Sequence, residues 1–170
     1  MKKVLLAVIG MFMLTGCFNK PYVDVKTSNY ATIQLVPESK TLLFKDDYYA
    51  FIRDYKIFRS KKECDYSNAD LGIIETNSDT PSRVAKVTAE KPILINANYR
   101  VQSGQSTFTE YTNIVLRPAK HRNYIVVYKK KSLNLFRSVS DFAIYEKRGN
   151  RRVSVPSSRI LSFNADKDCK

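Results

Sequence analysis

Histidine is almost absent from this sequence, since His121 is the only one among 170 residues. A metal site built from several histidines is therefore excluded. His121 lies between Lys120 and Arg122, and neighbouring cations disfavour the charged form of an imidazole. We interpret it as a polar turn residue rather than as the general base of a serine hydrolase.

Glycine and proline are also scarce, with five and six residues. Disordered and low-complexity chains are usually richer in both and poorer in aromatic residues. The eleven tyrosines and nine phenylalanines of this chain therefore indicate a folded domain with a substantial core.

The signatures of common enzyme classes are missing as well. The sequence contains no Gly-x-Ser-x-Gly, no Walker loop, no dinucleotide fingerprint and no His-Glu-x-x-His. A pair of carboxylates can serve a glycosidase, and the candidates here are Asp46, Asp47, Glu63, Asp65 and Asp70. Since most secreted domains carry such residues, we predict a protein that is not an enzyme and that needs neither metal nor cofactor.

The start of the chain is its most informative segment. Met1-Lys2-Lys3 is a positive head, and residues 4–14 form an apolar run interrupted only by Gly10. A charged head, a short apolar run and small residues at its end are the parts of a secretory signal. Because a membrane-spanning helix needs roughly 20 apolar residues, we predict a signal-peptide helix in the precursor rather than a transmembrane anchor.

Leu14-Thr15-Gly16-Cys17 closes this signal and resembles the lipobox of bacterial lipoproteins. The resemblance implies cleavage before Cys17 and acylation of that cysteine, which becomes the first residue of the mature chain. Two or more acyl chains anchor a protein stably, whereas one binds only marginally. In that family an aspartate after the cysteine often means retention in the inner membrane. Phe18 at this position implies the outer membrane, with the protein on its periplasmic face.

Removal of the signal, residues 1–16, would leave 154 residues, a suitable size for one domain. We expect residues 17–29 to form a lipidated tether and residues 30–170 a single domain. Lys2 and Lys3 leave with the signal, so 27 basic side chains would remain against 16 acidic ones, a net charge near +11. A chain this basic favours anionic partners. Because a secreted protein does not meet nucleic acid, the expected partners are anionic lipid headgroups or an envelope protein.

The three cysteines are consistent with this processing. With Cys17 acylated, Cys64 and Cys169 remain as a pair, and two such cysteines usually bond in an oxidising compartment. A bridge that closes a loop of roughly 100 residues contributes up to about 4.7 kcal/mol in the chain-entropy model. A metal or redox pair is the alternative, but their separation is not the Cys-x-x-Cys spacing. We predict a structural disulfide.

Basic residues gather in clusters, three of which lie near predicted turns and strand ends. One cluster, Arg117, Lys120 and Arg122, shares a single turn. Such clusters favour anionic partners electrostatically, although a solvated surface is the simpler interpretation. The residues that we single out for a contact with an anionic surface are Lys129, Lys130, Lys131, Lys147, Arg148, Arg151 and Arg152.

Apolar and polar residues alternate through much of the mature sequence, which is typical of half-buried strands. The clearest pair is 93–101 with 107–117, joined by a turn at 102–105. Further predicted strands are 30–35, 41–45, 55–59, 71–76, 124–128, 142–146 and 152–155, with a turn of helix over 46–54 capped by Asp46 or Asp47. The pattern predicts a mainly β protein, an antiparallel β-sandwich of about seven to nine short strands.

Three segments strengthen this prediction: Lys91-Pro92-Ile93, Leu116-Arg117-Pro118 and Tyr124-Ile125-Val126-Val127-Tyr128. Together they resemble the core hairpins of small periplasmic β-sandwich lipoproteins of unknown function. The likeness bears on the fold alone, since fold does not give function. We expect a non-enzymatic binding or scaffolding module. The alternatives are an inhibitor or accessory subunit of an envelope complex and, third, a hydrolase.

Overall fold

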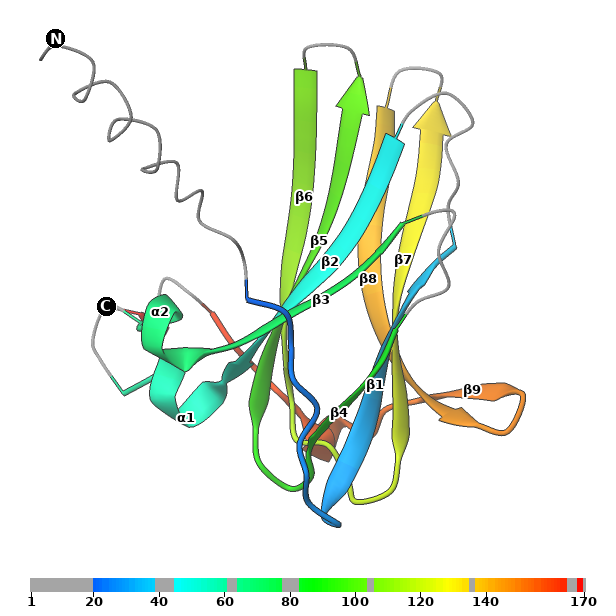
Figure 1. Cartoon of the computed structure of the whole chain (residues 1–170). Helices are drawn as coiled ribbons and strands as arrows, with labels where there is room; N and C mark the ends of the chain where they lie inside the picture. Colours follow the sequence, from blue (N-terminus) through cyan, green and yellow to red (C-terminus); the bar gives the residue numbers. More distant parts are fainter. Residues whose placement is uncertain are drawn as a thin grey trace, which may run out of the picture.

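The computed structural model shows two five-stranded β-sheets packed face to face (Figure 1). The structure describes residues 20–38, 45–60, 64–77, 83–103, 106–134, 137–164 and 168–169. The strands are β1 (Tyr30–Pro37), β2 (Lys45–Asp54), β3 (Asp70–Asn77), β4 (Val84–Thr88), β5 (Ile93–Ser103), β6 (Ser106–Leu116), β7 (Asn123–Asn134), β8 (Arg137–Arg148), β9 (Arg151–Ser154) and β10 (Ile160–Leu161). The predicted β-sandwich is therefore confirmed, with ten strands.

The first sheet has the strand order β4-β1-β7-β8-β9, and the second has the order β10-β6-β5-β2-β3. Strand pairs within the described residues are antiparallel except for β1 and β7, which run parallel. The two predicted hairpins, β5–β6 and β8–β9, are both present. Gly149 in the tight β8–β9 turn has a φ of 58°, which glycine adopts without strain.

The inner faces of the sheets form the main core. β1 buries Ala31, Ile33 and Leu35 and leaves the residues between them half-buried, which confirms the alternation of the sequence. Burial of an aliphatic side chain contributes roughly 1.5–3 kcal/mol. Other strands of both sheets complete this layer with Ala50, Ile52, Ile74, Ala85, Val87, Ile93, Ile95, Ala97, Leu116, Tyr124 and Val126.

The helical turn expected over residues 46–54, with Asp46 or Asp47 as its cap, is wrong. These residues lie in β2, where the side chains that alternate into the interior are Tyr48, Ala50 and Ile52. Burial of these three side chains therefore prevails over any local capping preference of the aspartates. The strand predicted at 41–45 lies outside the described residues apart from Lys45.

The strand expected at 55–59 is also wrong, because this stretch forms α1 (Tyr55–Phe58). The side chain of Asp54 accepts a hydrogen bond from the Ile57 N–H at 3.1 Å and so caps the helix. A second short helix, α2 (Tyr66–Ala69), is capped in the same way by Asp65, which accepts from the Asn68 N–H at 2.9 Å.

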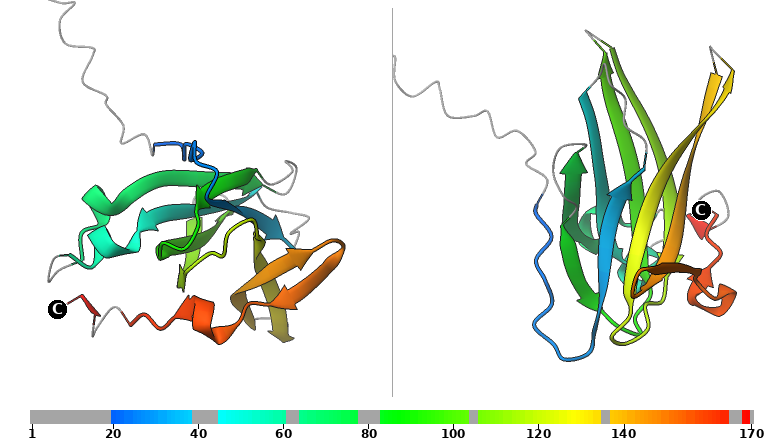
Figure 2. Two further views of the ribbon diagram at one scale, coloured as in Figure 1. Left: turned by 90° about the horizontal axis from the view of Figure 1, so that it is seen from below. Right: turned by 90° about the vertical axis from the view of Figure 1, so that its right-hand side faces the viewer.

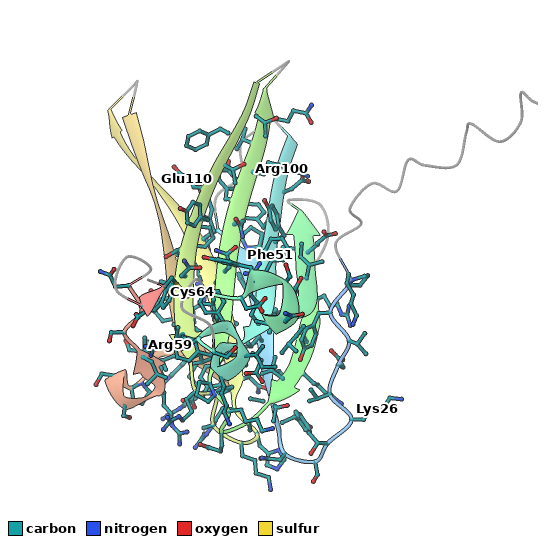
Figure 3. All side chains as sticks on the ribbon, turned by 90° about the vertical axis from the view of Figure 1, so that its left-hand side faces the viewer. Lys26, Phe51, Arg59, Cys64, Arg100 and Glu110 are labelled. Atoms are coloured by element: carbon teal, nitrogen blue, oxygen red, sulfur yellow. A yellow bond between two sulfur atoms is a disulfide. The ribbon has the colours of Figure 1, made fainter. Side chains whose placement is uncertain are left out.

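Both helices cover one end of the outer face of the second sheet (Figure 3). Phe58 and Tyr55 pack there with Leu94 and Val115 of the sheet, and Phe163 of the C-terminal segment lies against them. The predicted disulfide between Cys64 and Cys169 is present in this second, smaller core. It joins the C-terminal segment covalently to this core.

The segment expected to be a tether is part of the domain from Lys20 onward. Tyr22 is 2% exposed and contributes to the main core, and residues 20–29 run along the side of the sandwich formed by β3 and β4 (Figure 1). Residues 20–29 are therefore part of the domain, and the boundary expected at Tyr30 lies too late in the chain. The polar composition of this segment hid its packing, because its backbone rather than an apolar stripe makes most of the contacts.

At the opposite end from the turns β4–β5 and β6–β7, the hairpins β5–β6 and β7–β8 extend beyond the core and diverge (Figure 2). A cluster of rings lies where they separate. Tyr99 and Tyr128 are stacked at 4.2 Å between ring centroids, and Tyr48 and Phe142 pack against Tyr128 at 5.3 and 5.1 Å. This cluster holds the two sheets together at the top of the core.

Candidate binding surfaces

A cavity of about 10 Å³ lies beside this ring cluster, with Leu35, Ala97 and Val126 among its lining residues. One water molecule needs about 10–15 Å³, whereas sites for small molecules measure roughly 300–1,000 Å³. The space among the described side chains at this point is therefore no substrate cleft.

The three candidate carboxylates whose side chains are described have structural partners. Asp65 caps α2, Asp70 accepts the Gly72 N–H at 3.0 Å, and Asp47 forms an ion pair with Arg100 at 2.9 Å. The side chain of Asp46 and all of Glu63 lie outside the described part of the chain. Within that part, no three residues among histidine, cysteine, aspartate and glutamate come together as a metal site would require.

His121 lies in the exposed turn between β6 and β7. Its backbone N–H donates to the carbonyl of Tyr30 at 2.8 Å, and its ring meets the Tyr30 ring edge-on at 5.4 Å. Its φ is 57°, in the left-handed region. This geometry is that of a turn residue stacked on a neighbouring strand.

Two of the four cations at the β8–β9 hairpin are paired within the domain. Arg148 donates twice to the buried carboxylate of Glu146, at 2.7 and 3.2 Å, and Arg152 pairs with Glu38. The hydrogen bonds from Arg148 hold the pKa of Glu146 below its ordinary value. Lys147 and Arg151 are exposed, so this hairpin presents less unpaired charge than its sequence indicates.

Lys129, Lys130 and Lys131 lie in β7, where they pair in register with Asp141, Ser140 and Val139 of β8. The structure describes the backbone of these three residues but not their side chains. Asn123 at the other end of β7 pairs with Lys147. Six residues at about 3.3 Å each place the two basic groups roughly 20 Å apart along the sheet. The structure therefore puts them in one sheet but does not bring them together, and Cys17 lies outside the described residues.

The outer face of the second sheet carries a polar and aromatic row that the sequence did not reveal. Arg53 is 7% exposed, and its guanidinium lies 4.6 Å from the Phe51 ring and 5.1 Å from the Tyr66 ring. Its Nε and Nη1 atoms have no hydrogen-bond partner, and burial lowers its pKa. Two flanking rings stabilise such a cation. Since those two atoms are closed to solvent, the row is a packed structural feature.

β6 presents a long strand edge that is largely unpaired among the described residues. β10 pairs with Val115 and Leu116 of β6, and within the described residues no strand pairs with that edge from Ser106 to Ile114. The Arg117 N–H points out to the Arg159 carbonyl. Because orientation alternates along a strand, the groups that point outward are those of Thr107, Thr109, Tyr111 and Asn113.

Two large aromatic side chains on this edge are exposed. Phe108 is 56% exposed and Tyr111 is 70% exposed. The stretch 106–114 contains no lysine, arginine or proline, the residues with which proteins usually protect an edge. Sequence analysis identified β6 as a strand but could not tell that it lies at an edge, because strand order is a property of the assembled sheet.

A second exposed surface surrounds the N-terminal segment. Val23 is 65% exposed, Leu71 and Val84 are exposed beside it, and the side chains of Lys20 and Lys26 also face solvent. Asp24 binds the N-terminal segment to β4, because it pairs with Arg83 at 3.6 Å and accepts the Lys86 N–H at 3.1 Å. In the sequence, Gly72 was the one residue that could have indicated this packing of the N-terminal segment. An isolated glycine in an apolar strand often marks the close approach of another backbone.

Among the described residues, no helix combines the length and apolar character needed to cross a membrane. A scan against protein-family models gives no match for this chain, and a search of curated proteins finds no relative.

Proposed function

We propose that this protein is a lipoprotein anchored to the outer membrane through Cys17, on the periplasmic side, and that it acts there as a non-enzymatic binding module. Its binding surface is the open edge of β6, and its partner is an extended segment of another envelope protein. The lipobox resemblance at 14–17 supports the anchor. The disulfide between Cys64 and Cys169 fits an oxidising compartment.

The open edge of β6 is the observation that carries the binding role. Along the nine residues 106–114 the outward N–H and C=O groups have no strand beside them in the described part of the chain, so they form a template to which a partner strand can add. Each hydrogen bond formed contributes a net free energy of about 0.5–1.5 kcal/mol. The exposed rings of Phe108 and Tyr111 supply apolar area at the same edge. The small cavity and the structural partners of the described carboxylates favour this role over hydrolysis.

The positive net charge of the chain favours a different protein as the partner over a second copy of this chain. Two copies with net charges near +11 repel each other. An acidic partner is attracted by the same field. The stretch 106–114 contains one charged residue, Glu110. Long-range attraction therefore favours an acidic protein, while the edge itself favours neutral or apolar side chains in the added strand.

The anchor is tested by metabolic labelling with a palmitate analogue. The wild-type protein should incorporate the label and Cys17→Ser should not. Equal labelling of the two proteins would refute lipidation at Cys17.

The binding role is tested by affinity capture of the lipidated protein from crosslinked envelopes, with a matched pair of variants at Thr109. Thr109→Pro removes an outward N–H from the edge, whereas Thr109→Ala keeps it and changes the side chain alone. A partner that adds as a strand should be captured by the wild type and by Thr109→Ala and lost with Thr109→Pro. Capture of the same proteins by both variants would overturn the proposal.

A further inference from the structure

We infer that the β3–β4 side of the domain is held rigidly against the membrane surface, so that the open edge of β6 faces away from the bilayer. This inference rests on the proposed lipid at Cys17. It concerns the residues that follow the anchor, which attach to the domain almost at once.

The N-terminal segment joins β3 by backbone hydrogen bonds on both sides of Pro21. The Ile73 N–H donates to the Lys20 carbonyl at 2.9 Å, and the Tyr22 N–H donates to the Ile73 carbonyl at 2.9 Å. Pro21 thus pairs with Ile73 as a parallel bridge. Lys20 is therefore fixed to the sheet and does not belong to a free linker.

Tyr22 then connects the N-terminal segment to β4, which belongs to the other sheet. Its ring is buried in the main core, and its hydroxyl donates to the Lys86 carbonyl in β4 at 2.9 Å. Gly72 allows this close packing, because a Cβ added there would lie 2.6 Å from the Tyr22 Cα. Its φ of 127° is likewise accessible to few residues other than glycine. The segment thus bridges β3 and β4 and closes this side of the sandwich.

The chain between anchor and domain is consequently short. Phe18 and Asn19 alone separate Cys17 from Lys20, and three residue steps of at most about 3.6 Å span no more than about 11 Å. A flexible tether over 17–29 would instead give a root-mean-square reach of about 20 Å. Since the Debye length is about 8 Å at physiological salt, charges beside Lys20 lie close enough to act on headgroups.

The surface along the N-terminal segment has the chemistry of a membrane interface. Val23, Leu71 and Val84 expose aliphatic side chains, and Lys20 and Lys26 add positive charge. Apolar groups insert into the boundary between headgroups and acyl chains. Each lysine close to an anionic surface adds further attraction. This side therefore suits contact with an anionic bilayer.

The β6 edge lies on the other side of the molecule. β3 and β6 are three strand spacings apart in their sheet, roughly 14 Å. Figure 3 shows Glu110 of β6 and Lys26 of the N-terminal segment on opposite sides of the ribbon. A domain mounted by its β3–β4 side therefore presents the β6 edge toward the periplasm. The β8–β9 hairpin is also distant from the membrane-facing β3–β4 side, since β9 lies four strand spacings from β4.

The absence of tryptophan from the chain permits a direct test, because one introduced indole is the only such fluorophore. The mature protein is made with V23W or with Y111W, two positions of similar exposure on opposite sides. Its Cys17 thiol is coupled to a maleimide lipid in vesicles of phosphatidylglycerol and brominated phosphatidylcholine. Cys64 and Cys169 are bonded and do not react.

Bromine quenches an indole that reaches the acyl boundary, so V23W fluorescence should be quenched at least about twofold more than Y111W fluorescence. V84W provides a second reporter on the mounted side if V23W fails to fold. Insertion of ten glycine and serine residues after Asn19 should abolish the difference. Equal quenching of the two sides with the native spacing would overturn the inference. Because the lipid is attached chemically, this result does not depend on palmitate labelling in cells. Failure of the proposed orientation can therefore be distinguished from failure of lipidation.

Discussion

The two lateral sides of this sandwich differ in how their sheet edges are covered. Along β3 and β4 the chain itself covers the sheet edges, since Lys20 and Tyr22 bond to Ile73 and Tyr22 reaches Lys86. Along β6, β10 covers two residues and leaves nine open among the described residues. Backbone groups at an edge must bond to water, to the chain or to a partner. The comparison shows that residues 20–29 close the β3–β4 side, whereas most of the β6 edge has no strand beside it among the described residues.

The largest effect is expected from loss of the disulfide, which would widen the open side. Cys64→Ser should lower the free energy of unfolding by about 2–5 kcal/mol, because the C-terminal segment that carries β10 loses its covalent restraint. Equilibrium unfolding in urea measures the loss. Under non-reducing conditions, peptide mapping of the wild type should recover the linked pair, and two free thiols would contradict the disulfide.

Gly72→Ala should open the closed side. The added Cβ collides with the Tyr22 backbone and the residue must keep a φ of 127°, so we expect a loss of about 2–3 kcal/mol in the free energy of unfolding. Gly149→Ala is the matched control, since that Cβ meets nothing within 4 Å at a φ of 58°. It should cost about 1 kcal/mol. Equal losses for the two variants would mean that the close approach of Tyr22 is unimportant.

Tyr22→Phe tests the same side more finely. Loss of the hydroxyl leaves the Lys86 carbonyl without this donor and should cost about 1 kcal/mol at neutral pH. Amide hydrogen exchange should show faster opening of β4 and of residues 20–25. Unchanged protection of these amides would show that the hydroxyl does not hold the segment.

The pH dependence of Tyr22 gives a further check. Burial, with a smaller contribution from Asp24, raises the pKa of Tyr22 from 10.0 to about 12. The unfolded chain therefore releases this proton first, so the stabilisation is complete below pH 10 and is lost as the pH rises toward 12. Tyr22→Phe should lose less stability than the wild type over that range. Parallel unfolding curves for the two proteins above pH 10 would exclude this contribution.

The smallest effect is expected on the open side. Tyr111→Ala removes a ring that is 70% exposed, so the free energy of unfolding should change by no more than about 0.5 kcal/mol. Capture of the strand partner should nevertheless weaken. A large loss of stability would instead mean that this ring supports the fold.

The expectations that failed were those that depended on more than local pattern. Residues 46–54 and 55–59 exchanged their expected conformations, although Asp54 was in the sequence as a cap for the helix that follows it. Arg53 could not have been recognised as buried, because its stabilising rings come from β2 and from α2. Gly72 offered a signal of close packing, yet its partner, Tyr22, lies fifty residues earlier in the chain.

The sequence by itself determined the mainly β sandwich and the pairing of Cys64 with Cys169. Both follow from local or countable features: side-chain alternation with a period of two, and two cysteines left after the first is assigned to lipid. Tertiary structure alone decided that residues 20–29 pack on the domain, that β1 runs parallel to β7 and that β6 lies at an edge. These depend on which strands lie side by side, and a strand's own residues are compatible with several neighbours until the two sheets close around one core.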